Sequence, residues 1–195
     1  EGASPRNLTA STYGDELVLA TNQASRVFAV SIKDRGAILP GGRLGKAFWY
    51  SSSSGEFITS TYYYDDYPEW VVEWNEARHA DRYMDAVWEL LGEAGDYIFA
   101  DPDDRPSERP YKHLGRSFPH ELAAEEPADF YGALRYTPMG DELTVEFAKE
   151  LVTREGVGQG EATDMLAISL SANDYIAHAF GPNGLEAEDG MLRLD

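Results

Sequence analysis

Residues 165–178 read MLAISLSANDYIAH, in which an apolar run passes directly into polar and ionisable side chains. A short apolar run bounded by turn signals is typical of a buried strand in an α/β sheet. We expect this strand to end at Ser171, with Asp174 and His178 following four residues apart. In open α/β sheets, ligands and catalytic groups gather beyond the carboxyl ends of the strands. The stretch therefore predicts an α/β fold with a functional turn at this point.

A second apolar run, VFAVSI at residues 27–32, leads directly into Lys33, Asp34 and Arg35. We expect a second strand here. Because side chains alternate along an extended segment, Lys33 and Arg35 are predicted to point the same way. The planar fork of arginine and the compact charge of lysine both suit phosphate oxygens. The alternative interpretation is a solvated strand end whose two cations pair with neighbouring carboxylates.

Asp174 and His178 have the spacing of two side chains on one face of a helical turn. Carboxylate and neutral imidazole are the usual non-thiol ligands of a catalytic zinc ion, which takes three protein ligands and keeps one open position. The chain offers two such ligands here and no obvious third. The alternative interpretation is that Asp174 caps a helix and His178 is packed. If both strands deliver their polar ends to a shared rim of the sheet, the chemistry predicted is metal-assisted phosphoryl transfer.

The composition argues against several partners. A formal net charge of −19 is opposed to nucleic-acid binding, which needs a basic surface. No apolar run approaches the length of a membrane span, so we expect no membrane insertion. The chain has no cysteine, which excludes disulfides, thiolate zinc sites and a cysteine nucleophile.

The rest of the chain predicts a mixture of helices, strands and irregular segments. Gly36 and the Pro-Gly-Gly cluster at 40–42 are expected to break the backbone just after Arg35. Residues 96–127 are rich in Pro and charged residues and are expected to be irregular. The remaining expected elements are a helical turn opened by Ser4 and Pro5, a helix over 15–20, a β-hairpin over 48–61, a helix from residue 67 whose apolar stripe continues to Leu91, and a helix capped by Asp141 that loops at 156–160 into the strand at Met165.

Three segments follow from this pattern: a core segment over 1–46 that carries the Lys/Arg pair, an inserted cap-like segment over 47–130, and a core segment over 131–195 that carries the metal-ligand turn. Only two or three runs are typical of parallel core strands, fewer than a doubly wound sheet normally has. The last residues, 185–194, have the pattern of an amphipathic helix without a stop signal. We therefore interpret the chain as an internal piece of a longer protein.

Other candidates are weaker. Asp101, Asp103 and Asp104 lie in a loop that lacks the glycine and the terminal glutamate of an EF-hand, so a solvated acidic loop is favoured over a calcium site. The remaining histidines are expected to have structural or surface roles: His79, His113 and His120. The tryptophan stripe is expected to be core rather than a ligand platform: Trp70, Trp74 and Trp88.

Several stretches together resemble a known family. Residues 31–39 (SIKDRGAIL), 59–63 (TSTYY) and 171–181 are similar to the phosphate-irrepressible type of alkaline phosphatase, as are Ser4-Pro5 and residues 14–17. That family is grouped with the type I phosphodiesterases and nucleotide pyrophosphatases in the alkaline phosphatase superfamily. The resemblance implies an α/β/α sandwich with a mostly parallel sheet and inserted segments over the active site. It also implies an exported enzyme, periplasmic or secreted, with two zinc ions and a threonine nucleophile that becomes phosphorylated.

Carried over by position, the resemblance implies that Lys33 and Arg35 contact the phosphoryl oxygens and that Asp174 and His178 are two protein ligands of one zinc. It places the nucleophilic threonine and an active-site asparagine upstream of this chain, and further zinc ligands beyond its end. Ala177 stands where relatives often have glycine. No catalytic residue is then expected within the chain, which should be inactive by itself.

The function predicted is that of a segment of a zinc-dependent phosphomonoesterase acting on a small-molecule phosphate ester. The Lys-x-Arg pair favours monoesters over diesters by the same resemblance. Two alternatives stay open: a phosphodiesterase or nucleotide pyrophosphatase of the same superfamily, and a non-catalytic, acidic and aromatic-rich binding module. The sequence does not indicate the oligomeric state.

Overall fold

The computed structural model describes residues 2–195. Over this range the chain forms two compact units. The first unit contains the residues up to Ser51, Glu56–His79 and Leu143–Leu170, and the second contains Ser52–Gly55, Ala80–Glu142 and Ser171–Asp195. Each unit has its own sheet and core, and the two are described in turn.

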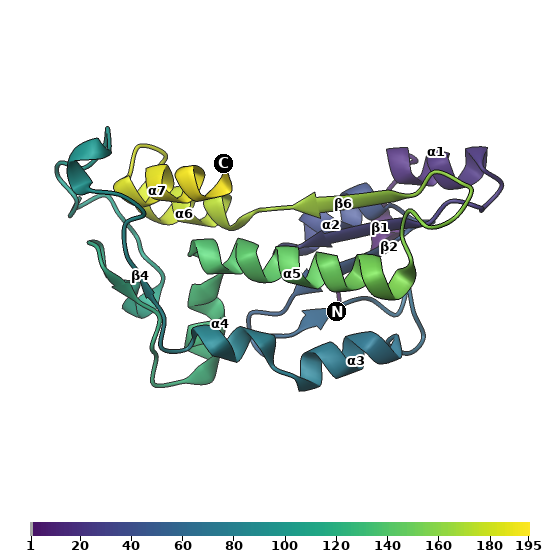
Figure 1. Cartoon of the computed structure of the whole chain (residues 1–195), viewed down its shortest axis with the longest axis horizontal. Coiled ribbons are helices and arrows are strands. Elements are labelled where there is room, and N and C mark those ends of the chain that lie inside the picture. Colours follow the sequence, from purple (N-terminus) through teal and green to yellow (C-terminus); the bar gives the residue numbers. More distant parts are fainter. Residues whose placement is uncertain (1) are drawn as a thin grey trace. The chain divides into compact units, whose positions relative to one another are not determined.

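The first unit is built around a mostly parallel sheet, whose strand order within residues 2–195 is β3-β2-β1-β6 (Figure 1). Strands β1 (Val27–Ser31), β2 (Lys46–Tyr50) and β6 (Met165–Ser169) are parallel, and β3 (Phe57–Ile58) is antiparallel to β2. The central strand β1 is buried along its whole length. This burial on both faces explains why its sequence is continuously apolar rather than alternating.

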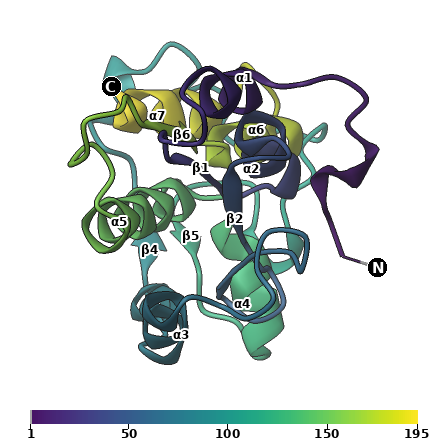
Figure 2. The ribbon, with the colours of Figure 1, turned by 90° about the vertical axis from the view of Figure 1, so that its right-hand side faces the viewer.

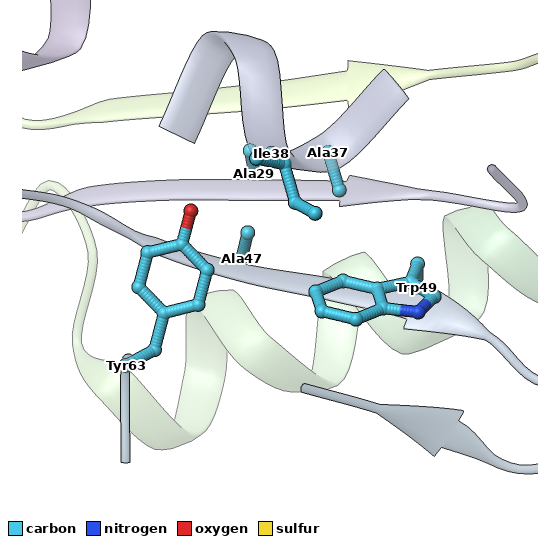
Figure 3. Close-up of a cluster of buried hydrophobic side chains, with 6 residues drawn as sticks. All are labelled: Ala29, Ala37, Ile38, Ala47, Trp49 and Tyr63. Atoms are coloured by element: carbon cyan, nitrogen blue, oxygen red, sulfur yellow. The ribbon is translucent and has the colours of Figure 1, made fainter. Parts of the chain in front are cut away.

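One face of this sheet is covered by α2 (Asp34–Gly41), which follows β1 directly. The helix packs closely because small residues line the contact: a side-chain carbon added at Gly41 would lie 3.3 Å from Ala47 Cβ and 3.4 Å from Ala29 Cβ. Figure 3 shows the resulting cluster. Trp49 and Tyr63 are its large aromatic members, beside the alanines of β1, β2 and α2. Helix α1 (Tyr13–Ala20) precedes β1 and begins with a capping box between Thr12 and Asp15.

The opposite face is aromatic. Phe147, from α5 (Pro138–Glu155), stacks on Phe57 at 4.1 Å between ring centroids and meets Phe48 edge-on at 5.5 Å. Trp70, from α3 (Glu69–Glu76), completes the cluster. Figure 2 shows α1 and α2 on one side of the strands and α3 and α5 on the other. The first unit is thus an α/β/α sandwich, and the fold class predicted from the sequence is confirmed.

The second unit consists of helices around a small antiparallel sheet of β4 (Val87–Trp88) and β5 (His120–Glu121). Its further elements are α4 (Pro127–Leu134), the first residues of α5, α6 (Ala172–Phe180), α7 (Leu185–Leu194) and the 3₁₀ turns η3 (Ala94–Asp96) and η4 (Lys112–Leu114). Trp88 is fully buried and packs edge-on against Phe118 at 5.1 Å.

A buried carboxylate organises this second core. Asp189, fully buried on α7, accepts hydrogen bonds from Trp88 Nε1 at 2.6 Å and from the Tyr97 hydroxyl at 2.6 Å. The Leu91 N–H and Arg193 Nε also donate to it, at 2.7 and 2.6 Å. Burial alone would raise the pKa of Asp189, but these hydrogen bonds outweigh it and lower the pKa below its usual value. The carboxylate therefore stays ionised inside the core.

The helix expected from residue 67 to Leu91 is wrong beyond Glu76. Helix α3 ends there, and Arg78 has a positive φ of 51°. The chain continues as the 3₁₀ turn η2 (His79–Tyr83) and then as β4. The left-handed conformation of Arg78 interrupts the helical hydrogen-bond pattern. Trp88 is buried as a residue of strand β4 rather than on a helix.

The expected break after Arg35 is also wrong. The 3₁₀ turn η1 (Pro5–Asn7) forms where Ser4 and Pro5 predict a helical turn. Strand β6 ends at Ser169 rather than at Ser171, and α2 begins at Asp34 and includes Pro40. Because Pro40 lies in the last turn of a short helix, its missing N–H removes only one intrahelical bond. The helix ends at Gly41, and the next residue, Gly42, has a φ of +66° that a side chain would disfavour.

Two apolar stretches are more exposed than expected. Strand β6 was expected to be buried, yet in the described part of the chain it is an edge strand of intermediate burial, with Ile168 42% exposed. The helix expected over 185–194 does form as α7, but its buried side carries Glu186 and Asp189, while Met191 is 55% exposed. Among residues 2–195, none of the helices has the length and apolar character needed to cross a membrane.

Candidate functional site

Lys33 lies at the turn from the central strand into α2. It is the residue before the helix, with extended backbone angles of φ −113° and ψ 136°. Its side chain is buried, with only 7% of the residue exposed. The Lys33 N–H donates to Ser31 Oγ at 3.0 Å, so the turn is tied back to the last residue of β1.

Arg35 lies in the first turn of α2 and has a different environment. Its side chain is 67% exposed, and its Nη1 is 3.9 Å from Asp34 Oδ1. The same Asp34 oxygen accepts the Arg35 N–H at 2.7 Å. An exposed pair at this separation is weak. The predicted extended geometry through Arg35 is wrong, because the strand ends at Ser31 and the helix begins at Asp34.

The surroundings favour an anion near this turn. The amino-terminal end of a helix carries a partial positive charge, which here adds to the charges of Lys33 and Arg35. Lysine charge that is shielded from water acts more strongly on a nearby phosphate than a solvated one. Asp34 offsets one of the two cations, so the turn keeps a small positive charge in a chain whose net charge is −19.

Asp174 and His178 project from one face of α6, as the spacing predicted. Asp174 Oδ1 is 3.6 Å from His178 Nε2, and the two side chains are 53% and 77% exposed. The alternative of a packed histidine is therefore wrong. The start of α6 is capped from within the second unit, because the Ala172 N–H donates to the buried carboxylate of Asp141 at 3.0 Å. Asp141 was expected to cap its own helix, but that helix begins earlier, at Pro138.

The donor set of Asp174 and His178 suits zinc, since a carboxylate oxygen and an imidazole nitrogen stand one helical turn apart and are accessible. Within the described residues, no group of three or more His, Asp or Glu side chains is placed to hold a metal ion. Two such side chains are fewer than the three protein ligands that a catalytic zinc ion takes. Lys33 and Arg35 belong to the first unit and Asp174 and His178 to the second, so the expected shared rim stays a prediction.

The weaker candidates have structural roles. His120 is fully buried, with Nδ1 2.8 Å from the Leu114 carbonyl and Nε2 3.1 Å from Glu186 Oε1. His79 stacks on Trp74 at 3.9 Å between centroids. Asp104 pairs with Arg116 at 2.9 Å. His113 Nε2 lies 3.1 Å from the Leu122 carbonyl, and Asp103 accepts the Phe118 N–H. Trp70 and Trp88 are buried, as expected of core residues.

Sequence reasoning missed the structural roles of Ser31, Gly36 and Asp141. Ser31 is fully buried where β1 ends, and a side-chain carbon at Gly36 would lie 2.5 Å from its Oγ. The available signal was a hydroxyl residue within an otherwise apolar run, with a glycine five residues later. Asp141 had no comparable signal, because its partner Ala172 is distant in sequence.

Taken together, the first unit is an α/β sandwich whose central strand leads into a turn that carries Lys33 and Arg35. No family model matches the chain. It is 44% identical to the alkaline phosphatase PhoV of Synechococcus elongatus over 194 residues, which are 98% of this chain and 35% of PhoV. It is 41% identical to a Myroides odoratus protein named calcium-transporting ATPase, covering 98% of this chain and 36% of that protein.

The solved structure of wild-type alkaline phosphatase PafA matches with a TM-score of 0.87 and 37% identity, covering 98% of this chain and 37% of that one. A PafA variant with substitutions at a threonine, an asparagine, a lysine and an arginine matches with a TM-score of 0.90. The predicted resemblance is confirmed: the chain is homologous to a segment of the phosphate-irrepressible alkaline phosphatases. It spans about 35% of the length of the curated relatives that it matches.

Proposed function

We propose that the chain is a segment of a zinc-dependent alkaline phosphatase that hydrolyses small phosphate monoesters through a phosphothreonine intermediate. One observation carries this proposal: nearly the whole chain is homologous to alkaline phosphatases, and its central strand leads into the turn that carries Lys33 and Arg35. The threonine nucleophile and the other zinc ligands would come from residues outside this chain. The segment alone would be inactive.

The spacing of the cationic pair supports the assignment. In the PafA variant, the substituted lysine and arginine are separated by one residue. Lys33-Asp34-Arg35 is the single place in these 195 residues where an arginine follows a lysine at that spacing. The match between a targeted pair in a homologue and a unique pair here is the reason to assign both side chains to the phosphoryl group.

In this proposal each residue has a defined role. Lys33 and Arg35 bind the non-bridging phosphoryl oxygens and stabilise the negative charge that the reaction concentrates there. Asp174 and His178 would hold one zinc ion, which when bound lowers the pKa of a coordinated oxygen and stabilises charge on it. Because Lys33 is buried and its N–H is hydrogen-bonded to Ser31, the turn would hold the lysine charge in place before substrate binds.

The remaining assignments follow from the resemblance. We propose a periplasmic or secreted location, and an insertion over 47–130 between core segments 1–46 and 131–195. The substrate would be a small phosphate ester rather than a nucleic acid, since the charge of −19 opposes a polyanionic partner.

The test uses the full-length protein that contains this chain. Hydrolysis of p-nitrophenyl phosphate with zinc at alkaline pH is expected to fall by at least about a hundredfold in the Lys33→Ala, Arg35→Ala double variant. Arg43→Ala is the matched control, because Arg43 is an exposed arginine just beyond α2. Undiminished turnover in the double variant would remove the role of the pair.

A second substrate separates the alternatives. Faster cleavage of bis-p-nitrophenyl phosphate than of the monoester would favour a phosphodiesterase. No hydrolysis of either ester and no zinc uptake by the full-length protein would favour a non-catalytic module.

A further inference from the structure

Ser31 occupies a buried junction at the end of the central strand. None of its surface is exposed, and its hydroxyl donates to the Ser169 carbonyl of β6 at 3.1 Å. The same oxygen accepts the Lys33 N–H at 3.0 Å. One hydroxyl thus connects the neighbouring edge strand to the turn that carries Lys33.

Gly36 confirms how closely the start of α2 approaches this hydroxyl. A side-chain carbon at Gly36 would lie 2.5 Å from Ser31 Oγ, 3.0 Å from Ser31 Cβ and 3.1 Å from Ser169 Oγ. Contacts this short are not tolerated in packed interiors. The first turn of the helix therefore rests on the Ser31 hydroxyl, and only a residue without a side chain fits there.

We infer that Ser31 is a positioning residue, which holds the Lys33 backbone in the conformation that presents its ammonium group to the phosphoryl oxygens. This inference rests on the proposed function and names a residue that the function alone does not identify. A phosphate-binding group must be held within a fraction of an ångström to be effective, and supporting hydrogen bonds supply that precision. Lys33 is buried and flanked by Ser31 on the strand side and by the helix on the other.

The first experiment measures phosphate recognition in the full-length protein. Ser31→Ala is expected to weaken inhibition by inorganic phosphate and to raise KM for p-nitrophenyl phosphate, each roughly tenfold, with a smaller change in kcat. Ser25→Ala is the matched control. Ser25 is also buried in the first unit, but its hydroxyl has no hydrogen-bond partner among the described residues. Equal phosphate inhibition in wild type and Ser31→Ala would overturn the inference.

The second experiment tests the contact without relying on activity. Amide hydrogen exchange at Lys33 is expected to accelerate in Ser31→Ala, which removes the acceptor of that N–H, and to stay unchanged in Ser25→Ala. Unchanged exchange at Lys33 in both variants would overturn the inference whatever the enzyme does. A wild-type protein that neither binds nor hydrolyses phosphate esters would remove the proposed function, and the positioning role would fall with it.

A double variant separates positioning from simple loss of folding. Gly36→Ala is expected to reduce kcat/KM strongly, because its added carbon meets Ser31 Oγ. Adding Gly36→Ala to Ser31→Ala should cost several-fold less, since the colliding oxygen is gone. An equal fold-reduction of kcat/KM by Gly36→Ala in the wild-type and Ser31→Ala backgrounds would contradict the contact on which the inference rests. Thermal unfolding of each variant shows whether it is folded at the assay temperature.

Discussion

Strands β1 and β6 are neighbours in one sheet, have the same length and are paired residue for residue, yet they differ in burial. Every residue of β1 is buried, whereas β6 has intermediate burial and exposes 42% of Ile168. Their sequences, VFAVS and MLAIS, are almost equally apolar. The difference arises because β1 has a strand on each side, while β6 has one among the described residues.

The polar residues that follow the two strands differ in the same way. After β1, Lys33 is buried and its backbone is hydrogen-bonded to Ser31. After β6, Asp174 and His178 stand exposed on a helical face. If the proposed roles are correct, the protein itself orders the proposed phosphate-binding end, whereas the proposed metal-binding end depends on the ion and on further ligands.

The largest expected effect is at the exposed end. Asp174→Ala in the full-length protein should reduce zinc affinity by more than about a hundredfold, because the proposed function makes Asp174 a direct ligand. The free energy of unfolding of the zinc-free protein should change by less than about 0.5 kcal/mol, because the side chain is half exposed. Asp96→Asn, at an exposed position of the second unit, is the control. Zinc titration and urea unfolding measure the two quantities, and unaltered zinc affinity would exclude Asp174 as a ligand.

The two cations should respond unequally. Lys33→Ala is expected to lower kcat/KM by about a hundredfold and Arg35→Ala by about tenfold, since a buried charge acts more strongly than an exposed one. Steady-state kinetics on p-nitrophenyl phosphate measure both. A larger loss of kcat/KM for Arg35→Ala than for Lys33→Ala would show that side-chain burial does not decide which charge contributes more.

The strands themselves should differ in their contribution to stability. Val30→Ala on β1 is expected to lower the free energy of unfolding by about 2 kcal/mol, because the side chain is fully buried and leaves a cavity. Ile168→Ala on β6 removes more carbon atoms from a half-exposed site and should cost less than about 1 kcal/mol. Urea unfolding of this chain or of the full-length protein provides the comparison. A larger loss at Ile168 in the full-length protein would mean that β6 is covered there.

The smallest effect is expected where the two strands begin. Asp164 accepts the Arg26 N–H at 2.7 Å and the Gly158 N–H at 2.8 Å, and the first of these hydrogen bonds is the main reason that its pKa is lowered. A lowered pKa contributes stability above the unfolded value near 3.8, and that stability is lost as the pH falls through the folded value. Asp164→Asn should therefore weaken the decline of stability below about pH 4. An identical pH profile for the variant would contradict this linkage.

Much of the fold was predictable from local patterns. The strands at 27–31 and 165–169, the hairpin near residue 50 and the helix after Ser171 all follow from apolar runs and breaker residues. The helix expected to reach Leu91 was wrong, because the buried Trp88 belongs to a two-stranded sheet that local periodicity does not reveal. The helix through Pro40 was missed because a proline in a last turn costs little when the rest of the helix packs on the sheet.

The candidate site was predictable in its residue types but not in its support. Lys33, Arg35, Asp174 and His178 could be chosen from their spacing and from resemblance to a family. Ser31 and Asp141 could not, because their roles depend on Ser169 and Ala172, which approach them only in the folded chain.

The amino-acid sequence by itself determined which segments are strands and which side chains bring charge to their ends, since periodicity and residue chemistry are local properties. The tertiary structure decided which of two similar strands is buried, which lysine is anchored, and where a glycine is needed. Those properties depend on neighbours that are distant in sequence, and close packing leaves no room for a substitute.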